Sequence, residues 1–112
     1  MRVAARDELH AFTTKDGSEI REFHHTAVQS LAEASLAPGQ STQRHYHRAS
    51  EEIYVLLEGE GDLEIDGEVR RVRPGDAALI PAGAWHELTA ASALRFLCCC
   101  VPPYSDADTF FE

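Results

Sequence analysis

The chain has 112 residues, an apolar content of 44% and a net charge of -9. A chain of this length can form one domain with an ordinary hydrophobic core, so we expect a single domain over residues 1–112. Nucleic-acid binding rests on a basic patch, and a membrane helix needs about 20 consecutive apolar residues. The sequence has neither feature, so we expect no nucleic-acid partner, no membrane partner and no signal peptide.

The N-terminal part of the chain predicts strands at the periphery of the domain. Residues 1–27 are expected to form one or two strands joined at the turn-forming pair Asp16-Gly17. Val28–Leu36 is rich in alanine and has a helical pattern at its centre. We favour a strand there, because Pro38-Gly39 ends the segment and strand-like segments follow.

The central part of the chain is typical of an all-β domain. Asp66-Gly67 separates two short segments of alternating character and predicts a two-residue hairpin. Ala77–Ile80 is typical of a short buried strand. Glu52–Leu57 and Leu94–Val101 are runs of β-branched, aromatic and apolar residues of strand length. Glycine and proline recur at short intervals, so we predict a sandwich or a small barrel.

The C-terminal residues 102–112 are predicted to form an irregular tail. Pro102 and Pro103 cannot donate to a sheet ladder. The pair Phe110-Phe111 is too apolar to remain in solvent, and we expect it to dock on its own barrel or on a partner.

Three cysteines stand side by side as Cys98, Cys99 and Cys100. An odd number of cysteines without spacing is not a disulfide framework. Free thiols are typical of a reducing compartment, so we expect a cytoplasmic protein. In a strand whose Arg95 faces solvent, Cys98 and Cys100 point inward and Cys99 points outward. Packing is the expected role of all three, and a redox or substrate-thiol role is the alternative if Cys98 or Cys100 lies near a metal.

Four residues form a candidate metal site. His45 and His47 are two apart, so on a strand both imidazoles point to one face and Tyr46 points away. Glu52 has the wrong parity for the same strand, but a turn at residues 48–50 would return its carboxylate to that side. His86 begins a later strand. Three imidazoles and a carboxylate suit a divalent metal and leave coordination positions open for a substrate or oxygen.

At these residues the chain resembles the cupin family. The first cupin motif, over residues 39–59, is matched by Gly39, His45, His47, Glu52 and Gly59. The second motif, over residues 75–90, is matched by Gly75, Pro81, Gly83 and His86, with Ala90 in place of the family's asparagine.

The resemblance implies a fold, a cofactor and a range of functions. The fold is a six- to eight-stranded jelly-roll β-barrel, and the cofactor is one divalent metal ion, Fe, Mn, Ni or Zn, held by His45, His47, Glu52 and His86. Cupins include dioxygenases, isomerases, lyases and non-catalytic binders. The presence of Glu52 argues against the thiol-dioxygenase branch, which uses three histidines alone. A metal-dependent enzyme, a metal-containing binding module and a metal-stabilised structural protein therefore all stay open.

Tyr54 is the candidate catalytic residue. It shares the face of Glu52 on a regular strand and is placed to hydrogen-bond a substrate or a metal-bound ligand. The alternative is a core tyrosine. We expect His10, His24 and His25 at the surface, and Trp85 at the barrel rim or in a dimer contact. The expected partners are a small-molecule ligand or substrate and a second copy of the chain in a homodimer.

Overall fold

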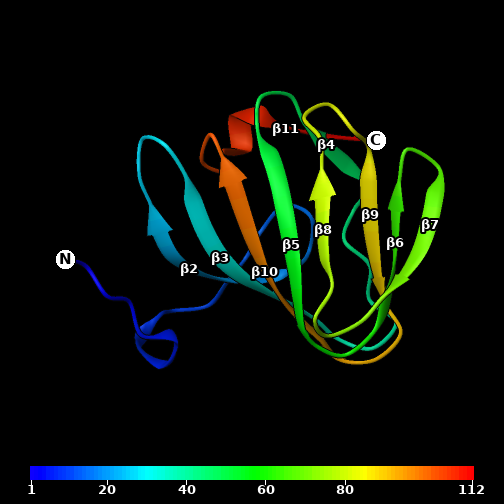
Figure 1. Ribbon diagram of the computed structural model, residues 1–112, viewed down its shortest axis with the longest axis horizontal. Helices are drawn as coiled ribbons and strands as arrows, with labels where there is room; N and C mark the ends of the chain where they lie inside the picture. The colour runs from blue at the N-terminus through cyan, green and yellow to red at the C-terminus, as the bar shows by residue number, and fades with distance from the viewer.

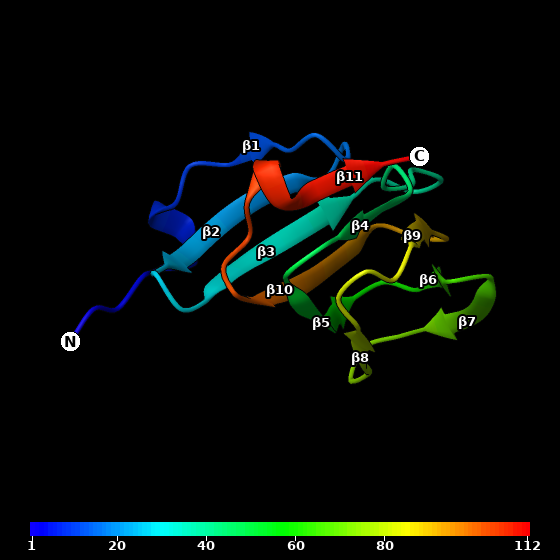
Figure 2. The same cartoon turned by 90° about the horizontal axis from the view of Figure 1, so that it is seen from above.

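The computed structural model describes residues 1–112 as two antiparallel sheets that lie face to face (Figures 1 and 2). The six-stranded sheet has the order β1 (Phe12–Thr13), β2 (Glu19–His25), β3 (Ser30–Leu36), β10 (Leu94–Val101), β5 (Glu51–Glu58) and β8 (Ala77–Ile80). The five-stranded sheet has the order β11 (Thr109–Phe111), β4 (His45–His47), β9 (His86–Ala90), β6 (Gly61–Ile65) and β7 (Glu68–Val72).

The predicted all-β jelly-roll fold is confirmed. The helical segments are two 3-10 turns, η1 (Arg6–Glu8) and η2 (Asp106–Asp108), and no helix is long and apolar enough to span a membrane. The strand count of eleven exceeds the expected six to eight, because β1, β4 and β11 span only two or three residues. The N-terminal segment before β1 extends away from the barrel (Figure 1).

The alternation of side chains along β5 shows how the sequence builds the barrel. Glu52, Tyr54 and Leu56 are buried between the sheets, whereas Ile53 faces outward and is 39% exposed. On the neighbouring strand β10, Phe96 lies opposite Leu56 and is also buried. This period of two is the signature of a strand with one face on the core.

The core contains twelve buried apolar residues drawn from both sheets. They are Ala34, Leu36, Tyr54, Leu56, Leu63, Val72, Ile80, Ala84, Leu88, Ala90, Leu94 and Phe96. Ala90, where the cupin motif has asparagine, is therefore a core residue at the far end of β9 from His86.

Several predicted elements are found where the sequence indicates. The ambiguous segment Val28–Leu36 contains strand β3 rather than a helix. At the predicted hairpin between β6 and β7, Asp66 and Gly67 both have positive φ, of 46° and 91°, as a tight two-residue hairpin turn requires. In the N-terminal part, β1 and β2 pair across the turn that contains Asp16.

The prediction of an irregular C-terminal tail is wrong for its last residues. Thr109–Phe111 form β11 and pair with β4, with Thr109 opposite His47. Pro102 and Pro103 prevent strand pairing only at their own positions. The turn η2 then brings the chain back to the edge of the five-stranded sheet. There Phe110 stacks on Tyr46 of β4 with ring centres 5.1 Å apart, so the terminal aromatic pair docks on its own barrel.

Candidate metal centre

Four buried side chains converge between the two sheets. His45 and His47 project from β4 and His86 from the start of β9, whereas Glu52 projects from β5 of the facing sheet. One ligand atom of each residue lies within 4.8 Å of the others. The structure thus brings together the four residues that the sequence spacing selects, and this buried cluster can hold a divalent metal ion.

Two of the facing atoms in the cluster lack hydrogen-bond partners. Glu52 Oε1 lies 3.4 Å from His47 Nε2 and 3.4 Å from His86 Nε2. Both Glu52 Oε1 and His86 Nε2 are buried without a hydrogen-bond partner. Because buried polar atoms are almost always satisfied, these atoms mark a point that suits a cation.

Backbone carbonyls anchor two of the imidazoles from behind. His45 Nδ1 donates to the Gln43 carbonyl at 2.6 Å, and His86 Nδ1 donates to the Ala84 carbonyl at 3.0 Å. A carbonyl only accepts, so in each neutral ring the hydrogen is on Nδ1 and the lone pair of Nε2 points into the cluster. This is the tautomer that a metal-ligating Nε2 needs.

The third imidazole is anchored by the C-terminal strand. His47 Nδ1 lies 3.1 Å from Thr109 Oγ1, and the Thr109 hydroxyl donates in turn to the Ser105 carbonyl at 2.8 Å. The threonine oxygen is therefore the acceptor from His47. Thr109 belongs to β11, in the segment that the sequence predicts to be irregular, so this contact could not be foreseen from sequence.

The cluster shifts the protonation of its own members. Burial lowers the pKa of His45 below its ordinary value, and the neighbouring His86 lowers it further. Burial would raise the pKa of Glu52, but the approach of His47 and His86 outweighs burial and holds that pKa far below its usual range. The site therefore favours neutral His45 and ionised Glu52, the forms that bind metal.

A cavity between the sheets lies against the cluster. Its volume is about 550 Å³ out to its open mouth. Tyr54, Cys98 and Cys100 line it, as predicted for the inward faces of their strands, and Phe96 lines it as well. Tyr104 also lines the cavity and was not foreseen, because it belongs to the predicted tail.

Asp108 fixes the turn on which the site depends. Its carboxylate accepts hydrogen bonds from the backbone N–H of Ala49 at 2.9 Å and of Ser50 at 3.1 Å. The Ser50 hydroxyl donates to the Pro102 carbonyl at 2.8 Å. Residues 48–50 connect β4 to β5, so the C-terminal segment holds the bend that carries Glu52 back toward His45 and His47.

The other candidate residues lie away from the cluster. His10 and His25 are exposed, and His24 is half-buried. Trp85 packs edge-on against Tyr46 with ring centres 4.7 Å apart, on the side of β4 that faces away from the metal cluster. Trp85 thus packs against a residue of its own chain.

The match to known proteins identifies the family. The cupin domain matches residues 32–100, and the chain belongs to this family. An uncharacterized protein of Methanocaldococcus jannaschii, MJ1618, is 43% identical over a 110-residue alignment that covers 92% of this chain and 88% of that protein.

More distant similarity agrees with this assignment. The oxalate-binding protein of Thermotoga maritima is 32% identical over a 79-residue alignment that covers 69% of this chain and 65% of that protein. The structure of KdgF from a Halomonas species superposes with a TM-score of 0.87 at 21% identity, over 96% of this chain and 98% of that chain, and shows the same fold.

Proposed function

We propose that this cupin is a metal-dependent enzyme that acts on a small molecule. One divalent ion, Fe, Mn, Ni or Zn, is held by Nε2 of His45, His47 and His86 and by Oε1 of Glu52. When bound, the ion supplies Lewis-acid or oxygen-activating chemistry, so the reaction is dioxygenase-like, isomerase-like or lyase-like.

The observation that carries the proposal is the unpartnered pair of buried atoms. With the hydrogen of His86 on Nδ1, the Nε2 lone pair of His86 faces the lone pairs of Glu52 Oε1 at 3.4 Å. Two acceptors at this separation repel each other unless a proton or a cation lies between them. A divalent cation also satisfies His45 and His47, which a single proton does not.

Tyr54 is the residue of the chain proposed to act on the bound molecule. Burial and the nearby Glu52 carboxylate raise the pKa of the Tyr54 hydroxyl well above its ordinary value. Its hydroxyl is therefore protonated near neutral pH, and it serves as a hydrogen-bond donor or proton donor rather than as a general base. Its side chain lines the same cavity as His45, His47 and Glu52.

The cavity supports a small ligand. Its volume of about 550 Å³ out to the open mouth lies within the range of about 300–1,000 Å³ that is usual for small-molecule sites. Four ligands from the chain leave two positions free on a six-coordinate ion, so a molecule with two neighbouring oxygen atoms fits the site best.

The alternative is a metal-containing binding module without catalysis. The similarity to an oxalate-binding protein supports this alternative. Replacement of Tyr54 by Phe separates the two. An enzyme loses turnover while it keeps its ligand affinity within a few-fold, whereas a binder shows no turnover in either form.

The metal assignment is tested with a matched pair of variants. Glu52→Gln keeps the size of the side chain but removes the charge, and Glu51→Gln makes the same change on the exposed neighbour. We expect Mn²⁺ to raise the thermal unfolding midpoint of the wild type and of E51Q, and to leave that of E52Q almost unchanged. Equal stabilisation of E52Q and E51Q by Mn²⁺ would contradict the assignment.

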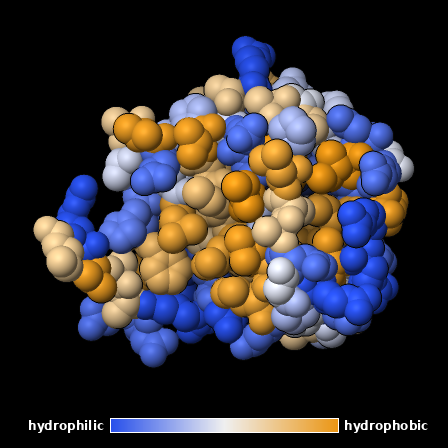
Figure 3. All heavy atoms as spheres, viewed as in Figure 1, coloured by the Kyte–Doolittle hydropathy of each residue, from blue (hydrophilic) through white to orange (hydrophobic).

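We further propose that the chain forms a homodimer through the outside of the six-stranded sheet. Figure 3 shows hydrophobic side chains gathered on this side. The outward residues of β3, β5, β8 and β10 that define this outer apolar face are Leu31, Ile53, Val55, Leu79, Leu97 and Cys99.

Two observations support a second copy as the occupant of the outer apolar face. The strands β5 and β10 carry apolar side chains on the outward face as well as on the inward one, with Ile53, Val55 and Leu97 outward, as is typical of strands that are covered on both sides. The chain carries a net charge of -9, whereas Glu33 and Arg95 beside this face form an ion pair at 2.6 Å, so a second copy meets little net charge here.

Sedimentation tests the dimer at micromolar concentration. We expect a dimeric wild type, a monomeric I53E and a dimeric V69E. Val69 is the control because it is 61% exposed on β7 of the other sheet. A monomeric wild type would contradict the proposal.

We also propose that the protein is located in the cytoplasm, which its three free thiols support.

A further inference from the structure

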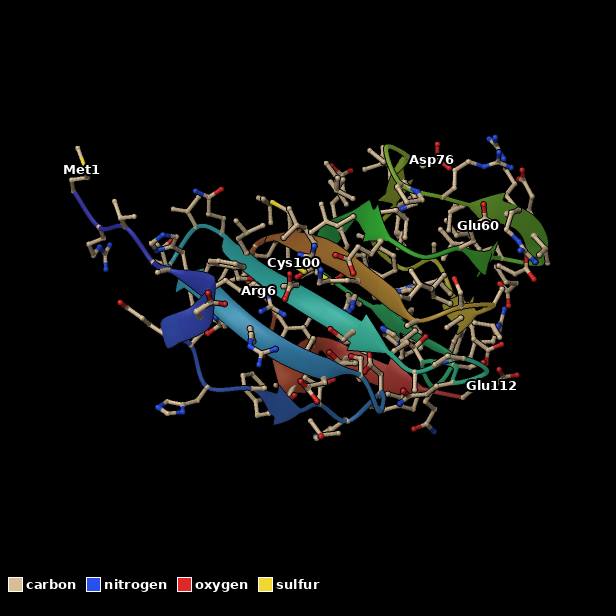
Figure 4. The ribbon with its side chains drawn as sticks, turned by 90° about the horizontal axis from the view of Figure 1, so that it is seen from below. Met1, Arg6, Glu60, Asp76, Cys100 and Glu112 are labelled. Carbon is tan, nitrogen blue, oxygen red and sulfur yellow. The ribbon has the colours of Figure 1, made fainter.

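The second carboxylate oxygen of Glu52 has a partner of its own. Cys100 Sγ donates to Glu52 Oε2 at 3.3 Å, and both side chains are buried. The two residues are direct cross-strand neighbours, since Cys100 of β10 pairs in register with Glu52 of β5. Figure 4 marks Cys100 on β10, the strand between β3 and β5.

The direction of this hydrogen bond follows from the chemistry of the two groups. An ionised carboxylate only accepts hydrogen bonds, so the Cys100 thiol is the donor. On the other side of Cys100, Ser30 of β3 is its neighbour in register, and the Ser30 hydroxyl accepts a hydrogen bond from the Tyr104 backbone N–H at 2.9 Å.

The two oxygens of Glu52 consequently have different environments. Oε1 faces His47 and His86 without a hydrogen-bond partner, whereas Oε2 is engaged by the thiol. We infer that Cys100 is a positioning residue that fixes the Glu52 carboxylate so that Oε1 alone is presented to the metal. This inference rests on the proposed metal centre and gives Cys100 a role beyond the packing predicted from sequence.

The two neighbouring cysteines lack this contact. Cys98 also lines the cavity, but its cross-strand neighbour on β5 is Tyr54 rather than Glu52. Cys99 belongs to the outer apolar face and is the control, because it offers the same thiol on the same strand away from the cavity. Among the three, Cys100 is the one whose thiol donates to Glu52.

The test compares the Mn²⁺ affinities of the wild type, C100A, C100S and C99A, with free Mn²⁺ measured by electron paramagnetic resonance. Removing a group that orients a metal ligand costs about 10- to 100-fold in metal affinity. We expect C100A to bind Mn²⁺ at least about tenfold more weakly than the wild type. The hydroxyl of C100S restores a donor and should return the affinity to within about threefold, while C99A stays at the wild-type value.

Thermal unfolding of the metal-free proteins separates positioning from folding. If C100A does not fold, Cys100→Val, which keeps the volume and removes the donor, takes its place. Wild-type affinity in the donor-free variant, or an equal loss in C100S, would overturn the role of Cys100 and leave the metal centre standing. A wild type that binds no Mn²⁺, Zn²⁺, Ni²⁺ or Fe²⁺ would overturn the metal centre and this role together.

Discussion

The hydrogen bonds between Asp108 and the bend at residues 48–50 make a specific prediction for stability. The variant Asp108→Ala removes a carboxylate that accepts from two backbone N–H groups, those of Ala49 and Ser50. A hydrogen bond to a charged group contributes about 1.5–3 kcal/mol. Because Asp108 is partly exposed and water replaces part of the interaction, we expect the pair of bonds together to contribute about 2 kcal/mol.

The expected change in unfolding temperature follows from the size of the domain. An unfolding entropy of about 2.1 cal/mol/K per residue gives about 0.24 kcal/mol/K for 112 residues. A loss of about 2 kcal/mol then lowers the unfolding midpoint by about 8 °C.

The assay is thermal unfolding of metal-free protein, followed by circular dichroism. Asp106→Ala is the matched control. Asp106 lies in the same turn, and its carboxylate accepts a hydrogen bond only from the Tyr104 hydroxyl at the surface. We expect D106A within about 2 °C of the wild type. A D108A midpoint equal to that of D106A would refute the conclusion that the C-terminal segment secures the bend between the strands that carry His47 and Glu52.

Two further predictions concern the backbone and the pH dependence of stability. Gly59 has φ +78°, and an added Cβ would collide with the Ala93 carbonyl, so Gly59→Ala should destabilise the fold by more than about 2 kcal/mol. Gly39 has φ +80° but open space around it, so Gly39→Ala should lower the free energy of unfolding by only about 1–2 kcal/mol. The denaturant midpoints of the two variants measure this difference, and equal losses would contradict it. The pKa of His45 is lowered in the folded state, so the unfolded chain binds more protons below about pH 6.5. Metal-free protein should therefore lose stability as the pH falls from 8 through 6.5. Urea titrations at pH 8 and 5.5 give the free energy of unfolding, and its decrease should be smaller in H45Q than in the wild type. An equal decrease in the two proteins would contradict the lowered pKa of His45.

Local sequence patterns were enough to predict much of the fold and the four clustered residues. The period of two places His45 and His47 on one face of a strand whatever the rest of the chain does. The Asp66-Gly67 pair and the apolar runs at β5 and β10 are equally local. The position of Glu52 needed only a bend at residues 48–50, which the spacing itself requires.

The supporting contacts were not predictable, because they join distant parts of the chain. Asp108 accepts hydrogen bonds from the bend more than fifty residues earlier in the sequence. Thr109 contacts His47 across the pair of β4 and β11, a strand pair that is not expected after two prolines. Cys100 lies beside Glu52 only because β10 inserts between β3 and β5. Strand order is set by the packing of the whole barrel, so such neighbours cannot be read from spacing alone.

The metal content of the protein tests the central claim most directly. The tag-free chain, purified without chelator, is analysed by elemental mass spectrometry per mole of chain, before and after incubation with Fe²⁺, Mn²⁺, Ni²⁺ and Zn²⁺. We predict about one equivalent of one divalent metal in the wild type, with most of it lost in His86→Ala. Absence of metal from the wild type after every incubation, or full occupancy in H86A, would contradict the proposed metal centre.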